Sequence, residues 1–123
     1  MSFTPRWTPA ATETFEGLRA AAEQAAANRA GSPGTGRGKG KTKASKQEGL
    51  FKQVAKAIGL LINNPRHPGL STHEYGSLEH PFDKSQKVFE AYAQNRTPGA
   101  YRIFWCYGPG KSDITIIAIT PHP

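Results

Sequence analysis

The chain of 123 residues carries a formal net charge of +7, and 37% of its residues are hydrophobic, a length and composition that suit a single domain with one core. Its one cysteine excludes an internal disulfide. No apolar run approaches the roughly 20 residues of a membrane span, and the N-terminus lacks the basic start and apolar centre of a signal peptide, so we expect a cytoplasmic protein.

The first predicted elements are a strand and a helix. Residues 2–7 predict a short strand, which Pro5 restricts to the edge of a sheet. Thr8 and Pro9 begin a helix, because threonine caps helices and proline fits the first helical position. Apolar side chains at helical spacing extend this helix to Arg29 or Ala30, with a predicted buried set of Phe15, Leu18, Ala22 and Ala25 or Ala26.

Residues 31–46 form a Gly/Lys-rich segment that we expect to be a flexible insertion between two helices. Such a composition cannot bury enough apolar surface to offset the entropy of ordering. Residues 30–46 hold five of the 16 Lys and Arg and no acid, so the rest of the chain is only mildly basic. Lys39, Lys41 and Lys43 are candidate contacts to an RNA backbone, and the alternative is a solvated loop.

A second helix is predicted from about Lys46 to Asn63. It ends there because the residue before Pro65 is disfavoured in a helix. Its apolar stripe is Leu50, Phe51, Val54, Ala55, Ile58, Leu61 and Ile62. Lys52 and Lys56 lie on the other flank, as candidate RNA contacts or as a solvated face.

Three strands are predicted in the second half of the chain, after a polar loop with a short strand near residues 70–75. The first covers Lys87–Gln94, with Phe89, Ala91 and Ala93 on one face and Val88, Glu90 and Tyr92 on the other. Residues 101–107 and 114–122 follow as an antiparallel hairpin. The sequence therefore predicts an α+β fold in a single domain, residues 1–123. It has an N-terminal strand, a two-helix hairpin, and a three-strand antiparallel meander packed on the helices.

The hairpin predicts one apolar face and one functional face. Alternation places Tyr101, Ile103, Trp105 and Tyr107 on the first face, and Arg102, Phe104 and Cys106 on the second. By the same parity Thr120 and His122 share a face. An arginine and an imidazole are therefore expected on adjacent strands. Cys106 lies in an apolar strand, which favours a buried structural thiol over a nucleophile.

The order of elements resembles the RelE/ParE superfamily of type II toxin-antitoxin toxins. The resemblance rests on P-R-H-P-G-L-S-T-H-E after the second helix, A-Y-R-I-F-W in the middle strand, and I-T-I-I-A-I-T-P-H at the end. It implies a toxin that cleaves messenger RNA, usually in the ribosomal A site, without a metal or cofactor, and so inhibits translation. It also implies partners: a cognate antitoxin protein, messenger RNA and the ribosome, but no membrane. RNA-cleaving members place an arginine at the position of Arg102, and some place a histidine near the C-terminus, as His122 is here.

The chemistry explains these residue types. A ribose 2′-hydroxyl attacks the adjacent phosphorus, so one group must take its proton, another must protonate the leaving 5′-oxygen, and a cation must stabilise the phosphorane. We expect Arg102 to stabilise this charge and His122 to act as general acid or base. Relatives use lysines or a glutamate before the arginine. Here the general base stays open among Glu90, Glu74 and His73.

Other candidate contacts have structural alternatives. Arg96 is a candidate phosphate contact, and Phe104 is a candidate base-stacking residue or a core residue. Arg102 itself could be a strand arginine that pairs with Glu90. His67, His73 and His80 are spaced irregularly with no cysteine nearby, which argues against a zinc site.

Two other functions are consistent with this reading. A ParE-like toxin would share the architecture but bind and inhibit DNA gyrase, and the pairing of Arg102 with His122 argues against it. A catalytically inert basic RNA-binding protein would bind the RNA backbone through residues 31–46.

Overall fold

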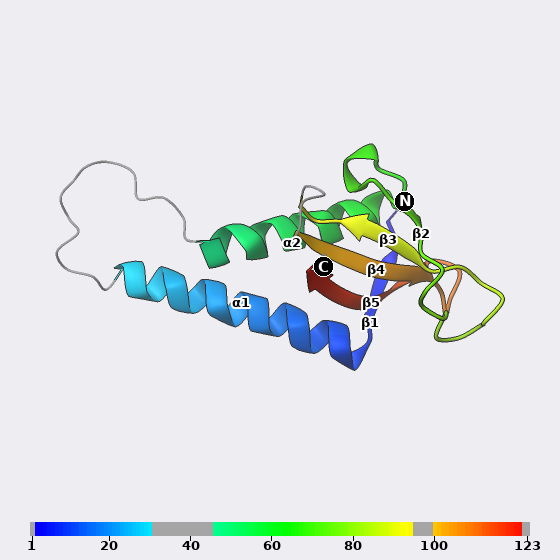
Figure 1. The fold of residues 1–123 in the computed structure, drawn as a ribbon, viewed down its shortest axis with the longest axis horizontal. Helices are drawn as coiled ribbons and strands as arrows, with labels where there is room; N and C mark the ends of the chain where they lie inside the picture. The colour runs from blue at the N-terminus through cyan, green and yellow to red at the C-terminus, as the bar shows by residue number, and fades with distance from the viewer. Residues whose placement is uncertain (1, 31–45, 95–99, 122–123) are drawn as a thin grey trace.

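A computed structural model describes residues 2–30, 46–94 and 100–121 (Figure 1). The elements are β1 (Thr4–Trp7), α1 (Pro9–Ala30), α2 (Lys46–Asn63), the 3₁₀ turn η2 (Pro68–Leu70), β2 (His73–Glu74), β3 (Phe89–Tyr92), β4 (Tyr101–Tyr107) and β5 (Asp113–Pro121). They form a five-stranded sheet in the order β1-β5-β4-β3-β2, in which β1 is parallel to β5 and every other pair is antiparallel. The predicted α+β fold is confirmed, with the meander at the centre of the sheet.

The first helix begins as its sequence predicts. The Thr8 hydroxyl accepts a hydrogen bond from the Ala11 backbone N–H at 3.1 Å, which is an N-cap, and Pro9 occupies the first helical position. The same hydroxyl donates to the Ile117 carbonyl at 2.6 Å and so ties the helix start to β5. In Figure 1 α1 and α2 run antiparallel to each other, which confirms the predicted helical hairpin. No described helix is both long and apolar enough to cross a membrane.

One face of the sheet packs against the helices. The core cluster joins helix residues to alternate residues of the three central strands: Ala11, Val54, Ala57, Ile58, Leu61, Leu70, Ala91, Ile103, Trp105, Ile114, Ile116 and Ile119. The register of β4 against β5 shifts between Phe104 and Trp105, because Ile117 is an extra residue at a β-bulge. The alternation predicted for β4 is confirmed, with Ile103 and Trp105 in the core and Arg102 on the opposite face.

The opposite face is partly covered by the loop between β2 and β3. His80 anchors this loop and is itself buried. Its Nδ1 accepts from the backbone N–H groups of Phe82 and Asp83, each at 3.1 Å, and its Nε2 lies 3.0 Å from the Tyr107 carbonyl. Because Nδ1 accepts, Nε2 carries the proton and donates to that carbonyl. One ring nitrogen is therefore occupied within the loop, and the other ties the loop to the end of β4.

Cys106 is fully buried on this second face, as predicted, and burial raises the pKa of its thiol to about 11. We predict that native protein resists alkylation by iodoacetamide at pH 8, because the thiolate is the nucleophile and the neutral form dominates there. Intact-mass measurement should find the native chain unmodified and the chain in guanidinium fully modified. Rapid alkylation of the native chain at pH 8 would contradict this account.

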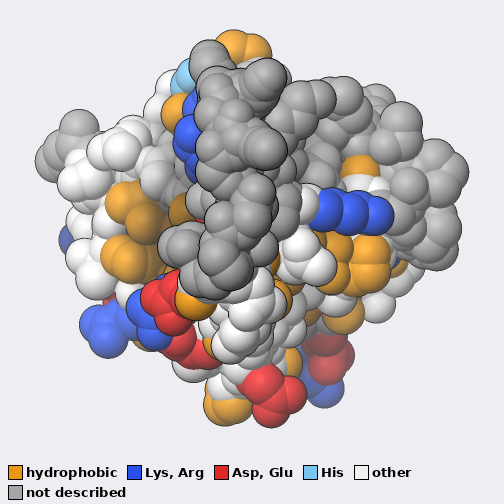
Figure 2. Space-filling model, turned by 90° about the vertical axis from the view of Figure 1, so that its left-hand side faces the viewer, with side chains coloured by type: hydrophobic (Ala, Val, Ile, Leu, Met, Phe, Trp, Pro, Cys, Tyr) orange, Lys and Arg blue, Asp and Glu red, His pale blue; other side chains and the backbone are white. Residues whose placement is uncertain are grey.

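Figure 2 views the molecule from the left-hand side of Figure 1. Acidic and basic side chains both appear on this side, with apolar patches between them. The described part of this surface is therefore not uniformly basic, which agrees with the mild charge expected outside residues 30–46.

Candidate active site

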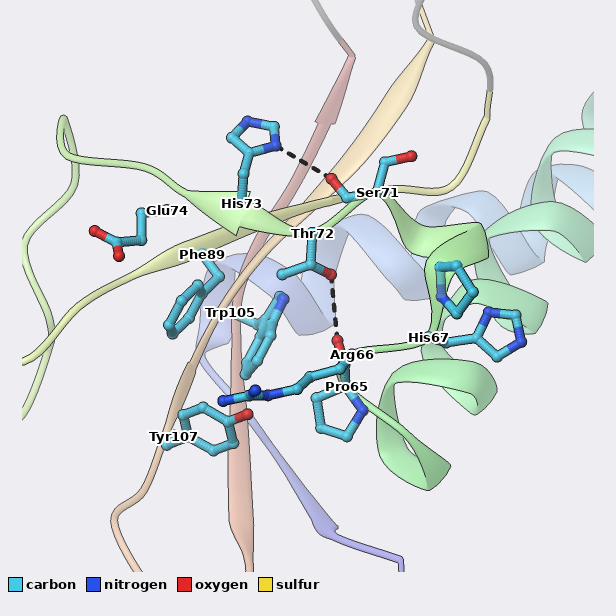
Figure 3. Close-up of a pocket in the computed structure, with 11 residues that line it drawn as sticks. Pro65, Arg66, His67, Ser71, Thr72, His73, Glu74, Phe89, Trp105 and Tyr107 are labelled. Carbon is cyan, nitrogen blue, oxygen red and sulfur yellow. Dashed lines mark hydrogen bonds between the residues drawn. The ribbon is translucent and has the colours of Figure 1, made fainter.

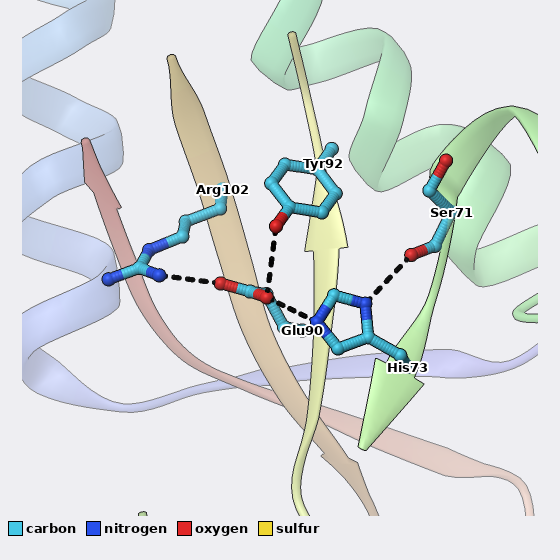
Figure 4. A network of polar contacts seen from close by, with 5 residues as sticks. All are labelled: Ser71, His73, Glu90, Tyr92 and Arg102. Atoms are coloured by element: carbon cyan, nitrogen blue, oxygen red, sulfur yellow. Dashed lines mark hydrogen bonds and ion pairs between the residues drawn. The ribbon is translucent and has the colours of Figure 1, made fainter. Parts of the chain in front are cut away.

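A row of three ionisable side chains crosses β4, β3 and β2 on the face away from the helices (Figure 4). Arg102 Nη1 lies 2.6 Å from Glu90 Oε2, and His73 Nε2 lies 2.6 Å from Glu90 Oε1. The side chains are 13%, 3% and 45% exposed for Arg102, Glu90 and His73. The row therefore runs from a nearly buried cation, through a buried anion, to an imidazole that is open to solvent.

Glu90 accepts from three donors. One nitrogen of His73 and one of Arg102 contact its two oxygens, and the Tyr92 hydroxyl donates to Oε1 at 3.3 Å. A buried carboxylate is stable only when paired and hydrogen-bonded, and these donors supply that pairing. Both carboxylate oxygens of Glu90 are therefore in contact with polar groups of the chain itself.

His73 contacts two oxygen atoms through its ring. Nδ1 lies 3.1 Å from the Ser71 carbonyl and Nε2 lies beside the Glu90 carboxylate. Ser71 has a left-handed backbone conformation, with φ 49° and ψ 42°, at the end of η2. That conformation is uncommon for a residue other than glycine, and functional sites are among the places where it is found.

Arg102 rests on aromatic rings and keeps one donor unpaired. Its guanidinium carbon is 4.8 Å from the ring centroid of Phe104 and 5.7 Å from that of Tyr75. These two rings are themselves 4.6 Å apart. The Nε atom is buried and has no hydrogen-bond partner in the described part of the chain. An unpaired buried donor is costly, and the planar fork of arginine matches the oxygens of a phosphate.

The structure separates the remaining candidates from this row. Glu74 pairs with Phe89 across the strands, so its side chain lies on the helix-side face, where it accepts from Lys87 Nζ at 3.0 Å. Phe104 is buried under Arg102 and Tyr75, so it supports the arginine and offers no open face to a base. Lys52 and Lys56 are exposed on α2, whose apolar side packs on the other face of the sheet.

Five predicted residues lie outside the described residues: His122, Arg96, Lys39, Lys41 and Lys43. The insertion at residues 31–45 is outside them too. β5 pairs antiparallel with β4 as far as Pro121, and in this pair Thr120 lies opposite Arg102.

The histidines considered for zinc do not gather. Both ring nitrogens of His80 contact backbone groups, of the loop and of β4, and His67 Nδ1 accepts from the Gly69 N–H at 2.9 Å. Among the described residues, no three His, Cys, Asp or Glu side chains form a group that could hold a metal ion.

Sequence reasoning missed two residues of this site. Tyr75 packs beside Phe104 beneath Arg102, and Ser71 orients His73 through its backbone carbonyl. Neither has a signal in the sequence, because Tyr75 follows a strand of only two residues and Ser71 acts through its backbone. Strand alternation had placed Tyr92 on the same face as Glu90, but the hydrogen bond between them was not predicted.

The sequence matches no known family model and no curated protein. Two solved structures share its fold. A chain of the archaeal RelE-RelB complex from Pyrococcus horikoshii OT3 aligns over 98% of this chain and 96% of its own, with 11% identity and a TM-score of 0.52. The YoeB dimer from Staphylococcus aureus aligns over 100% of both chains, with 9% identity and a TM-score of 0.54. The chain therefore has a RelE-like fold.

Proposed function

We propose that this chain with a RelE-like fold is the toxin of a type II toxin-antitoxin system, a metal-independent endoribonuclease that cleaves messenger RNA and inhibits translation. The observation that carries the proposal is the nearly buried Arg102, with an unpaired Nε, held by Glu90 beside a half-exposed His73. The fold shared with RelE and YoeB supports the same reaction class.

The proposed reaction is attack by a ribose 2′-hydroxyl on its own 3′-phosphate. The bond from the 2′-oxygen to phosphorus forms, the bond to the 5′-oxygen breaks, and the products are a 2′,3′-cyclic phosphate and a 5′-hydroxyl. One proton leaves the 2′-hydroxyl and one joins the 5′-oxygen. No oxidant, reductant or metal is required by this balance.

We propose a role in RNA cleavage for each residue of the row. Arg102 stabilises the charge of the phosphorane through its guanidinium. Glu90 is a positioning residue for Arg102 and His73. His73 is suited to proton transfer because its side chain is 45% exposed and lies in the same row as Arg102. We propose His122 as the general base; Glu74 lies on the helix-side face of the sheet, away from the row.

The proposed partners are a cognate antitoxin, messenger RNA and the ribosome. One of the two structural neighbours is a RelE-RelB complex, which supports an antitoxin partner here. A net charge of +7 favours association with the acidic segment of a protein and with RNA.

A second candidate function is a catalytically inert RNA-binding protein. It is favoured by the contact between Arg102 and Glu90, which neutralises the arginine as a purely structural pair would. In that case RNA binding would persist without any cleavage.

The experiment that tests the proposal is cleavage of a defined messenger RNA by purified protein, with and without programmed ribosomes. Loss of general acid or base catalysis predicts that His122→Ala and His73→Gln each slow cleavage about 10²-fold or more. Lys84→Ala is the matched control, because that lysine is 82% exposed and lies outside the row.

Cleavage that neither histidine substitution slows would contradict the proposed roles. Binding of RNA without any cutting would establish the inert protein. Absence of both, together with inhibition of gyrase supercoiling, would establish a ParE-like toxin.

A further inference from the structure

A cavity lies on the helix-side face of the sheet, opposite to the face that carries Arg102. It has a volume of about 450 Å³ and opens between the segment after α2 and the strands β3 and β4 (Figure 3). Its principal walls are Pro65, Arg66, Thr72, Phe89, Trp105 and Tyr107. This volume falls in the range of small-molecule sites.

Three aromatic rings form one side of the cavity. The rings of Phe89 and Trp105 are stacked with centroids 4.8 Å apart, and Tyr107 meets Trp105 edge-on at 4.9 Å. Phe89 is half-buried and Tyr107 is exposed, so the cluster is open to solvent at one end. Such a wall favours a flat, apolar group.

The indole of Trp105 adds an unused hydrogen-bond donor. Trp105 is 1% exposed, and its Nε1 has no partner among the described residues. In Figure 3 the nitrogen side of the indole is turned toward Thr72. The Thr72 hydroxyl donates to the Pro65 carbonyl at 3.3 Å and does not accept from the indole. Because indole nitrogen only donates, a group that completes this site must bring an acceptor.

Arg66 supplies a positive charge at the same cavity. Its side chain is exposed and extends across the cavity toward Tyr107 in Figure 3. Within the described ranges the Arg66 side chain forms no ion pair. A guanidinium in this position can stack on a base or pair with a phosphate.

We propose that this cavity binds a nucleobase of the RNA substrate, which deepens the proposed function and rests on it. A nucleobase is flat, carries ring-nitrogen and carbonyl acceptors for the Trp105 N–H, and is linked to phosphates that Arg66 attracts. An apolar protein side chain would fill the space but would leave the indole donor unpaired.

The position of the cavity relative to the candidate active site supports this assignment. The segment from Ser71 to Glu74 lines the cavity and also carries His73, whose ring contacts Glu90 on the other face. β2 is the edge strand of the sheet and has only two residues. An RNA strand that crosses this short edge can place a base in the cavity and a neighbouring phosphate near Arg102.

The test uses the indole N–H resonances of the full chain, measured by NMR during titration with AMP, GMP, CMP and UMP. The chain has two tryptophans, so Trp7→Phe leaves the Trp105 signal alone and assigns it. We expect at least one nucleotide to shift the Trp105 signal while the Trp7 signal of the wild type stays in place. Arg66→Ala should weaken that binding about 10-fold, and Arg19→Ala, an exposed arginine on α1, should leave it unchanged.

Failure to shift the Trp105 signal with any nucleotide would overturn the assignment. A shift caused by N-acetylphenylalaninamide and by no nucleotide would overturn it in favour of a protein ligand. Cleavage of RNA without a nucleotide-dependent shift would reject the cavity and leave the nuclease intact. A shift that depends on Arg66, in a protein that cuts no RNA, would support the cavity and reject the nuclease.

Discussion

Arg102→Ala should slow RNA cleavage by about 10²–10³-fold, the loss typical of removing one group that stabilises transition-state charge. The guanidinium is 13% exposed beside Glu90, and its planar fork matches the oxygens of a phosphate. Single-turnover cleavage of a defined RNA, at protein concentrations that saturate the substrate, measures this step directly.

Two further variants separate charge, geometry and folding. Arg102→Lys keeps the charge but loses the planar fork, so it should recover only part of the rate. Arg6→Ala is the matched control, because Arg6 is also a strand arginine beside a carboxylate, Asp113 at 3.3 Å, but is 58% exposed. Thermal unfolding shows which variants remain folded. Equal rates for the wild type and a folded Arg102→Ala variant would remove Arg102 from the mechanism.

Glu90→Ala should lower the free energy of unfolding by about 3–5 kcal/mol, because it leaves Arg102 nearly buried without its counter-charge. The same change also removes the acceptor of His73 and of the Tyr92 hydroxyl. Urea denaturation followed by fluorescence measures the loss. Glu79→Ala is the control, since Glu79 is 66% exposed and 3.7 Å from Lys84, and its loss should stay within about 0.5 kcal/mol.

The double variant of Glu90 and Arg102 tests whether the two charges act as a pair. Removing both avoids an unpaired buried charge, so the double loss should be smaller than the sum of the single losses by about 0.5–3 kcal/mol. Additive losses would mean that the two side chains do not stabilise each other. Because unfolding and cleavage are measured separately, a structural role for the pair does not hide a catalytic role.

The sequence alone predicted the elements and their faces. Helix α1 could be placed because Thr8 and Pro9 are a local start signal, and α2 because its apolar residues repeat at helical spacing. These features depend on residues close together in the chain, so their signals are local. The structural alternative for Arg102, pairing with Glu90, is present in the structure, where the two residues lie on neighbouring strands.

Strand alternation did not decide how the face that carries Arg102 and Glu90 is used. Glu90 follows the polar side of its strand, which by itself allows a solvent-facing carboxylate, but the packed structure buries it between Arg102 and His73. Burial depends on the loop and strands that cover the residue, and these are distant in the sequence. The buried N–H groups of Arg102 and Trp105 that lack a partner within residues 2–30, 46–94 and 100–121 are likewise visible only after packing.

The choice among His73, Glu74 and Glu90 shows the same limit most clearly. β2 has two residues, too few for a periodic signal, and neighbouring side chains of a strand point to opposite faces. A slip of one residue in its pairing with β3 would exchange His73 and Glu74. The tertiary structure pairs His73 with Glu90 and Glu74 with Phe89, and this register, set by contacts between distant segments, brings the imidazole to the row.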